Sequence, residues 1–288
     1  MPTVDVHQHL WPEPLVEALG VRRRPPRLRG SILELAGERQ SEIDLRAHDL
    51  GARLALLDRC EIDVAVISLP PTLGIDTLPE DEAAELYTAY ERGILELTAA
   101  SAGRLVPLAA GSRVDGFAGA CVGAGELLDL DQLSPRLDEL ERRAAFLFVH
   151  PGPAHPPPGA PEWWPAVVEY TAQMQAAYAV WLAEGADRWP GLKVLFAILA
   201  GGGPFHFERL ISRGVSGRDL LHENVFFETA SYGRRALELC LATFGVGQLL
   251  FGSGAPAIDP ETTLDAVRGF GDAVTDALCN QNPSRLLS

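Results

Sequence analysis

The sequence contains few of the features that mark a membrane, secreted or nucleic-acid-binding protein. It has no run of about 18 apolar residues, so we expect no membrane-spanning helix. Its start is neither basic nor followed by an apolar stretch, so we expect no signal peptide. Only 24 Lys and Arg oppose 39 Asp and Glu, and the net charge of −15 disfavours nucleic acid and anionic membranes as partners. We therefore expect a soluble, cytoplasmic protein.

Cysteine is also scarce. Cys60, Cys121, Cys240 and Cys279 lie far apart and form no C-x-x-C pair. This spacing predicts reduced core thiols rather than disulfides or zinc ligands. No Ser-His-Asp or Cys-His arrangement stands out either, so the sequence does not indicate a hydrolase with a nucleophilic side chain.

Short apolar segments alternate with helical patterns along the whole chain. We predict strands within residues 4–12, 63–71, 104–112, 119–127, 145–152, 193–203, 224–231 and 248–256. Helices are predicted between them, the clearest at 48–60, 78–103, 133–144, 165–185 and 262–279. Eight strands alternating with helices over 288 residues predict an α/β fold, a single (β/α)8 barrel that takes up residues 1–288.

Residues 10–43 interrupt this alternation after the first strand. We expect them to form an irregular excursion, because the segment 21–30 contains five arginines and prolines that exclude a helix. The excursion is either a solvated surface loop or a lid that attracts an anionic substrate, such as a carboxylate, by its charge.

Histidines stand where two of the predicted strands end. Successive side chains of a strand alternate between its faces, so His7 and His9 should project together, with Asp5 one step behind them. His150 follows the apolar run 145–149. Ligands and catalytic groups of such barrels lie at the carboxyl ends of the strands. Three histidines there could hold Zn²⁺ and leave a fourth position for water, so we predict a zinc site at His7, His9 and His150.

Several motifs occur in the order expected for one known family. They are Asp5-x-His7-x-His9, Val149-His150-Pro151-Gly152, the glycine turn 199–205, the strand 248–256 and the closing stretch 281–287. With them the chain resembles the amidohydrolase superfamily, in the decarboxylase-like branch of aminocarboxymuconate semialdehyde decarboxylase and γ-resorcylate decarboxylase. The resemblance implies a metal-dependent barrel that cleaves C–C or C–N bonds of small carboxylated or cyclic molecules. It also implies metal-ligand positions at His7, His9 and His150, and a homodimer, which is common among similar proteins.

Two positions depart from the family's pattern. The acid/base histidine of its sixth strand falls at Ile198, and the aspartate of its eighth strand falls at Gly254. Neither residue can move a proton or bind a metal. Losing general acid–base help typically costs about 10²–10⁴-fold in rate, so the usual reaction would be slow unless other residues substitute.

Other polar residues near the predicted strand ends could take over these roles. We predict Glu228 and Asp259 as catalytic residues, with Glu126 as a further candidate, although each could instead make a surface or structural hydrogen bond. Glu228 lies in an apolar context and needs a partner. Predicted substrate-binding residues are Trp163, His155 and His206.

Three functions remain open at this point. The first is a metal-dependent hydrolase or lyase that acts on a small carboxylated or cyclic compound. The second is a repurposed barrel enzyme without metal, which would catalyse a cyclisation or dehydration by binding and orientation. The third is a non-catalytic binding protein. We predict the first, and the absence of a proton-transfer group at Ile198 and Gly254 is the reason that the second and third stay open.

Overall fold

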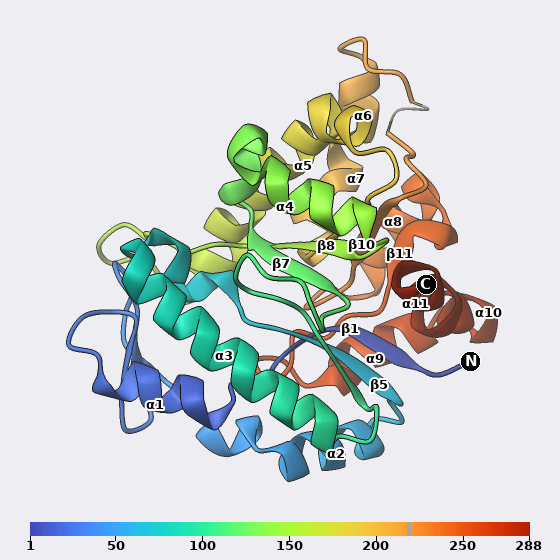
Figure 1. The fold of residues 1–288 in the computed structure, drawn as a ribbon. Coiled ribbons are helices and arrows are strands. Elements are labelled where there is room, and N and C mark those ends of the chain that lie inside the picture. Colours follow the sequence, from blue (N-terminus) through green and yellow to red (C-terminus); the bar gives the residue numbers. More distant parts are fainter. Residues whose placement is uncertain (218–219) are drawn as a thin grey trace.

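The computed structural model describes residues 1–217 and 220–288 and contains an eight-stranded parallel barrel (Figure 1). Its strands are β1 (Val4–His9), β5 (Val64–Ser68), β6 (Leu105–Pro107), β7 (Gly119–Gly123), β8 (Phe146–His150), β9 (Lys193–Phe196), β10 (Val225–Glu228) and β11 (Leu249–Leu250). They pair in the orders β1-β5-β6 and β11-β10-β9-β8-β7. Parallel bridges between Gln8 and Ala255 and between Ala109 and Ala120 close the two seams. The predicted (β/α)8 barrel is confirmed.

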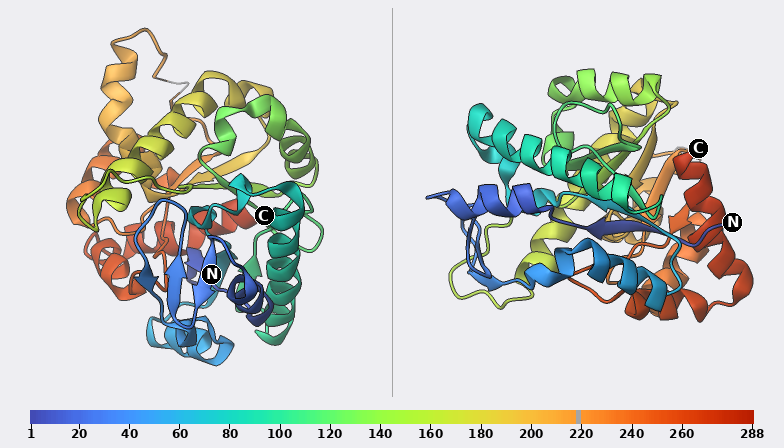
Figure 2. Two further views of the ribbon diagram at one scale, coloured as in Figure 1. Left: turned by 90° about the vertical axis from the view of Figure 1, so that its left-hand side faces the viewer. Right: turned by 60° about the horizontal axis from the view of Figure 1, so that its bottom comes forward.

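Helices surround the barrel on its outside (Figures 1 and 2). They are α1 (Glu13–Val21), α2 (Leu50–Arg59), α3 (Glu80–Ala100), α4 (Leu130–Arg142), α5 (Tyr170–Val180), α6 (Ala186–Arg188), α7 (Ile198–Ile211), α8 (Arg234–Phe244), α9 (Pro260–Arg268), α10 (Asp272–Asp276) and α11 (Asn282–Leu287). The single helix predicted for 262–279 is wrong. Gly271, with φ +91°, lies between α9 and α10 and interrupts it, because a left-handed residue cannot continue a right-handed helix.

The excursion after β1 is more regular than predicted. It contains α1 and a small antiparallel sheet of β2 (Arg27–Arg29), β3 (Ile32–Glu34) and β4 (Ser41–Glu42). An ion pair of 2.6 Å between Arg27 and Glu34 supports the first hairpin. The excursion lies on the same side of the molecule as the loop after β8 (Figures 1 and 2), where the Ala154 amide donates to Glu38 over 3.3 Å.

The core fills the barrel and the layer between barrel and helices. Phe227 of β10 stacks on Phe244 of α8 with ring centroids 4.5 Å apart, and Tyr178 of α5 meets both Phe227 and Phe196 edge-on. All four cysteines are buried and free, as predicted. Among the described residues, no helix has the length and apolar character needed to span a membrane.

One predicted strand is much shorter than expected. β9 ends at Phe196 instead of reaching residue 203, and the five residues Ile198–Gly202 all have positive φ, from +44° to +95°. They make a left-handed turn before the right-handed part of α7 begins. A Cβ on Gly201 would lie 2.2 Å from the carbonyl oxygen of Thr171, in the first turn of α5, so this turn requires glycine where it packs against that helix.

Candidate metal centre

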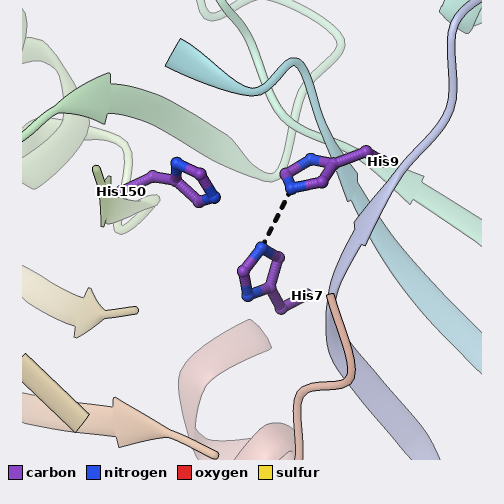
Figure 3. A group of neighbouring side chains, drawn as sticks. All are labelled: His7, His9 and His150. Carbon is purple, nitrogen blue, oxygen red and sulfur yellow. Dashed lines mark hydrogen bonds between the residues drawn. The ribbon is translucent and has the colours of Figure 1, made fainter. Parts of the chain in front are cut away.

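Three histidines meet inside the carboxyl end of the barrel (Figure 3). His7 and His9 come from the end of β1, and His150 is the last residue of β8. One ring nitrogen from each lies within 4.8 Å of the other two, and the Nε2 atoms of His7 and His9 are 3.1 Å apart. The structure thus brings together the three residues predicted as metal ligands.

A bulge in β1 sets the direction of these side chains. The register with β5 pairs Asp5 with Ala65 and Gln8 with Ile67, so β1 has one residue more than its partner between these pairs. Asp5 and Gln8 therefore share one face and His9 lies on the other. The predicted placement of Asp5 behind the histidines is wrong. Its carboxylate accepts from Gln8 Nε2 at 2.8 Å and from the Ser253 amide at 3.0 Å.

An oxygen lies near Nδ1 of each imidazole, and for His9 and His150 the contact is a hydrogen bond. His9 Nδ1 lies 3.1 Å from the Ser68 carbonyl oxygen, and His150 Nδ1 lies 2.9 Å from the Pro151 carbonyl oxygen. His7 Nδ1 lies 3.1 Å from Oε1 of Glu228. An oxygen at each Nδ1 favours the tautomer that carries its proton there, which leaves the Nε2 lone pair free for an ion.

Burial disfavours the charged form of two of these imidazoles. It lowers the pKa of His150 to about 3, with a further contribution from His7. It also holds the pKa of His9 well below its usual value, and both His7 and His150 add to this shift. Three imidazoles whose ring nitrogens converge are a donor set that suits zinc and similar divalent ions, so the residues present fit a metal ion.

Glu228 has the partners that its apolar sequence context demands. The side chain is fully buried at the end of β10. Its Oε1 accepts from the Ile198 amide at 2.5 Å and its Oε2 accepts from the Ala230 amide at 2.6 Å. Together with the contact to His7, these bonds fix the carboxylate behind the cluster. From this position Glu228 can orient the ring of His7.

The chain was compared with known proteins. A family model described as amidohydrolase matches residues 4–288. The chain belongs to the amidohydrolase family. In an alignment of length 283 it is 24% identical to 2-amino-3-carboxymuconate-6-semialdehyde decarboxylase of Dictyostelium discoideum, and the match covers 85% of this chain and 78% of that protein.

Solved structures share the fold of this amidohydrolase. The apo form of IDCase from Metarhizium anisopliae matches with a TM-score of 0.80 at 20% identity, over 99% of this chain and 97% of that one. Dihydroxybenzoic acid decarboxylase from Polaromonas, solved with manganese and the inhibitor 2-nitroresorcinol, matches with a TM-score of 0.74 at 17% identity, over 99% and 96%.

The two positions where this amidohydrolase departs from the family's pattern both adopt unusual backbone conformations. Ile198 has φ +44°, which is strained for a β-branched residue, and it lies half-buried beside Glu228. Gly254 has φ +78°, and its amide donates to the carbonyl of His7 at 2.8 Å. A Cβ at Gly254 would lie 3.5 Å from that of Ala230, an ordinary contact. Space for a side chain exists there, but the backbone favours glycine.

Asp259 lies apart from the histidines. It caps α9 by accepting from the Glu261 amide, and it forms an ion pair of 3.1 Å with Arg59, the last residue of α2. α2 ends just before β5 starts, so Arg59 lies toward the amino ends of the strands, opposite the cluster. Glu126 accepts from the Gly123 amide at 2.8 Å, and burial raises its pKa.

The predicted substrate-binding residues occupy the outer parts of the molecule. Trp163 is 56% exposed, just before α5, with its ring 6.1 Å from that of Trp164. His155 donates its amide to Glu169, and its ring lies next to Gly37 of the excursion. His206 is half-buried on α7. None of these contacts joins them to the three histidines.

Sequence reasoning missed the groups that orient the site. The Ser68 hydroxyl, whose oxygen lies 3.2 Å from Nδ1 of His9, and the Pro151 carbonyl are such groups. So is Arg53, which is buried and donates to Gln8 and to the carbonyl of His9. A Ser at the end of a strand predicted to neighbour the first one was a usable signal. A carbonyl oxygen carries no sequence signal.

Proposed function

We propose that this amidohydrolase is a metal-dependent carbon–carbon lyase that decarboxylates a small carboxylated aromatic or cyclic compound. One divalent ion would be held by His7, His9 and His150. The observation that carries the proposal is the convergence of three ring nitrogens, in rings that each have an oxygen near Nδ1. Support also comes from the names of the relatives, among them a semialdehyde decarboxylase and a 5-carboxyvanillate decarboxylase from Sphingomonas paucimobilis.

Within this proposal the ion is zinc. A neighbour of known structure holds manganese, which prefers oxygen ligands. Here glycine at 254 leaves three imidazoles without the family's aspartate, and imidazole suits zinc better than manganese. When bound, such an ion polarises a substrate oxygen and stabilises negative charge that develops on it.

The protein's own residues would then bind and orient the substrate. Glu228 would keep His7 in place, since two backbone amides fix its carboxylate 3.1 Å from Nδ1 of His7. Ile198 offers an apolar side chain where the family has a proton-transfer group, so turnover would be slow. The second candidate function is a barrel enzyme that works without metal, and it is favoured by Ile198 and Gly254.

We also propose a cytoplasmic homodimer. Trp163, Val167 and Phe205 are large apolar side chains that are 56%, 58% and 73% exposed on or beside α5 and α7, which pack together. Such side chains on one side of a molecule mark an interaction surface. Light scattering after size exclusion should give twice the mass of 31.0 kDa, and Phe205→Glu should reduce it to the monomer.

Metal analysis tests the main proposal. Protein purified without chelator should contain about one zinc per chain, His150→Ala should lose most of it, and His222→Gln, which changes a histidine outside the cluster, should keep it. The loaded enzyme should release CO₂ from at least one of 2,6-dihydroxybenzoate, 5-carboxyvanillate and related acids. A wild-type protein with far less than one metal per chain, even after incubation with zinc, would sink the proposal in favour of the metal-free enzyme.

A further inference from the structure

The first residues of the loop that follows His150 have almost no backbone donors with which to hold their own shape. Residues 151–165 contain seven prolines, which donate no backbone hydrogen bond, and the first three residues are Pro151-Gly152-Pro153. Yet the carbonyl of Pro151 has to stay at one place, because it is the acceptor 2.9 Å from Nδ1 of His150. Contacts from outside the loop must therefore fix it.

One side chain makes both of the contacts that this stretch allows. Gln173, half-buried on α5, accepts from the Gly152 amide through Oε1 at 2.8 Å. Its Nε2 donates to the Pro153 carbonyl at 2.9 Å. Gly152 carries the single backbone N–H of these three residues. A planar amide bound at both ends fixes the position and the orientation of the peptide units next to Pro151.

α5 is itself immobilised against the barrel. The neighbouring side chain on this helix, Gln175, donates to the Gly201 carbonyl at 2.6 Å. Thr171 packs so closely on Gly201 that a Cβ there would lie 2.2 Å from its carbonyl oxygen. Gln173 thus extends from a helix that is pinned to the left-handed turn after β9.

We propose that Gln173 is a positioning residue of the metal centre. It holds Gly152 and Pro153 so that the Pro151 carbonyl accepts the Nδ1 proton of His150, which keeps Nε2 of His150 turned toward His7 and His9. The part of this proposal that concerns metal affinity rests on the proposed function. The part that concerns the tautomer of His150 does not.

Two glutamine variants on the same helix test it. Gln173→Met removes both contacts to the loop after β8. Gln175→Met is the control, because it makes the same substitution on α5 but removes the contact to the turn after β9. Gln173→Glu keeps an acceptor for the Gly152 amide but loses the donor to Pro153. Histidine-labelled, metal-free protein is examined by long-range ¹H–¹⁵N NMR, which distinguishes Nδ1–H from Nε2–H for each ring. Zinc affinity is then measured by competition with a chelator.

We expect His150 to carry its proton on Nδ1 in the wild type and in Gln175→Met, and to be a mixture of tautomers in Gln173→Met. The zinc dissociation constant should rise about 10–100-fold in Gln173→Met, as is typical when a group that orders a ligand is lost, and less in Gln173→Glu. An unchanged His150 tautomer in Gln173→Met overturns the positioning role. An equal change in Gln175→Met also overturns it, since the cause would be a displaced helix. A wild type that binds no zinc overturns the proposed function, and the tautomer result still decides the positioning role.

Discussion

Each histidine of the cluster depends on a different kind of oxygen. For His7 it is a buried carboxylate, for His9 the backbone of the neighbouring strand, and for His150 the carbonyl of the next residue. The strand-end rule was sufficient to predict from the sequence that these three histidines come together. It could not predict their orientation, because two of the three acceptors are backbone atoms whose position follows from strand register and loop shape.

Substitutions at position 254 test whether the missing carboxylate determines which metal the site prefers. Gly254→Asp should restore a fourth ligand and shift the preference of the site from zinc toward manganese, because manganese favours oxygen donors. Metal content after incubation with equal zinc and manganese measures this preference.

Gly254→Ala is the matched control, since it brings the same backbone strain at φ +78° without a ligand. Both variants should lose about 1–2 kcal/mol in the free energy of unfolding, with the smaller loss for Asp, which tolerates left-handed backbone better. If Gly254→Asp and Gly254→Ala take up the same metals in the same ratio, the vacancy at 254 does not set the preference.

At the scale of elements, three helices are each followed by a non-glycine residue in the unfavourable left-handed conformation. α2, α3 and α4 are followed by Glu61, Ala102 and Ala144, with φ of +57°, +52° and +54°. Glycine is the usual residue at such a left-handed helix end, because it has no Cβ to clash with the backbone. Each of these helices leads into a barrel strand. The position of that strand fixes the backbone conformation of the turn, so a residue with a Cβ adopts positive φ there.

An alanine pair at the end of α3 tests this strain. Ala102→Gly should raise the free energy of unfolding by about 0.5–1 kcal/mol, because Ala102 is exposed and has φ +52°. Ala99→Gly, an exposed position inside the same helix, should lower it by about 1 kcal/mol. Urea unfolding of both variants measures the two changes. Equal destabilisation would show that the left-handed turn costs nothing here.

The sequence predicted strands and helices correctly where the spacing of apolar residues is enough to identify them. The eight strands and the helices between them follow from alternating apolar segments, and most ends fall within a few residues. The face of Asp5 and the left-handed turn at 198–202 were not predictable. A bulge shifts the alternation of β1, and three of the five residues in the turn, Ile198, Leu199 and Ala200, are not types that signal positive φ.

For the whole molecule, closure of the barrel joins the two ends of the chain. The Ser253 amide donates to Asp5, 248 residues away, and Asn280 donates to the carbonyl of Met1. The alternation of elements predicted this closure, but not the small sheet of the excursion. Its strands have only two or three residues and are rich in charge, which leaves no period-2 pattern to detect.

The stability of the whole protein should fall in mild acid, and His48 contributes to this. Burial, with the charge of Arg53, lowers the pKa of His48 to about 4, and its Nδ1 accepts from the Trp11 amide at 3.0 Å. An unfolded histidine titrates near 6.5, so the unfolded chain binds more protons between pH 6.5 and about 4. The contribution of a neutral His48 is complete above pH 6.5 and is lost as the pH falls toward 4.

Melting temperatures from pH 7.5 to 4.5 measure this loss. The wild type should fall more steeply than His48→Asn, whose side-chain oxygen can still accept from Trp11 but does not titrate. His222→Asn, at a half-buried position near the surface, should follow the wild type. A wild-type slope equal to that of His48→Asn would contradict the contribution of His48.

The bulged strand β1 also has a consequence for the order of folding. It carries two of the three proposed ligands, yet it is held between β5 and the residues that follow β11, which are the last part of the barrel to leave the ribosome. While the chain is being synthesised, His7 and His9 are available without His150 and without a closed seam. High-affinity capture of an ion therefore has to wait for the last strand, and an ion that binds the closed barrel but not the open chain opposes reopening of that seam.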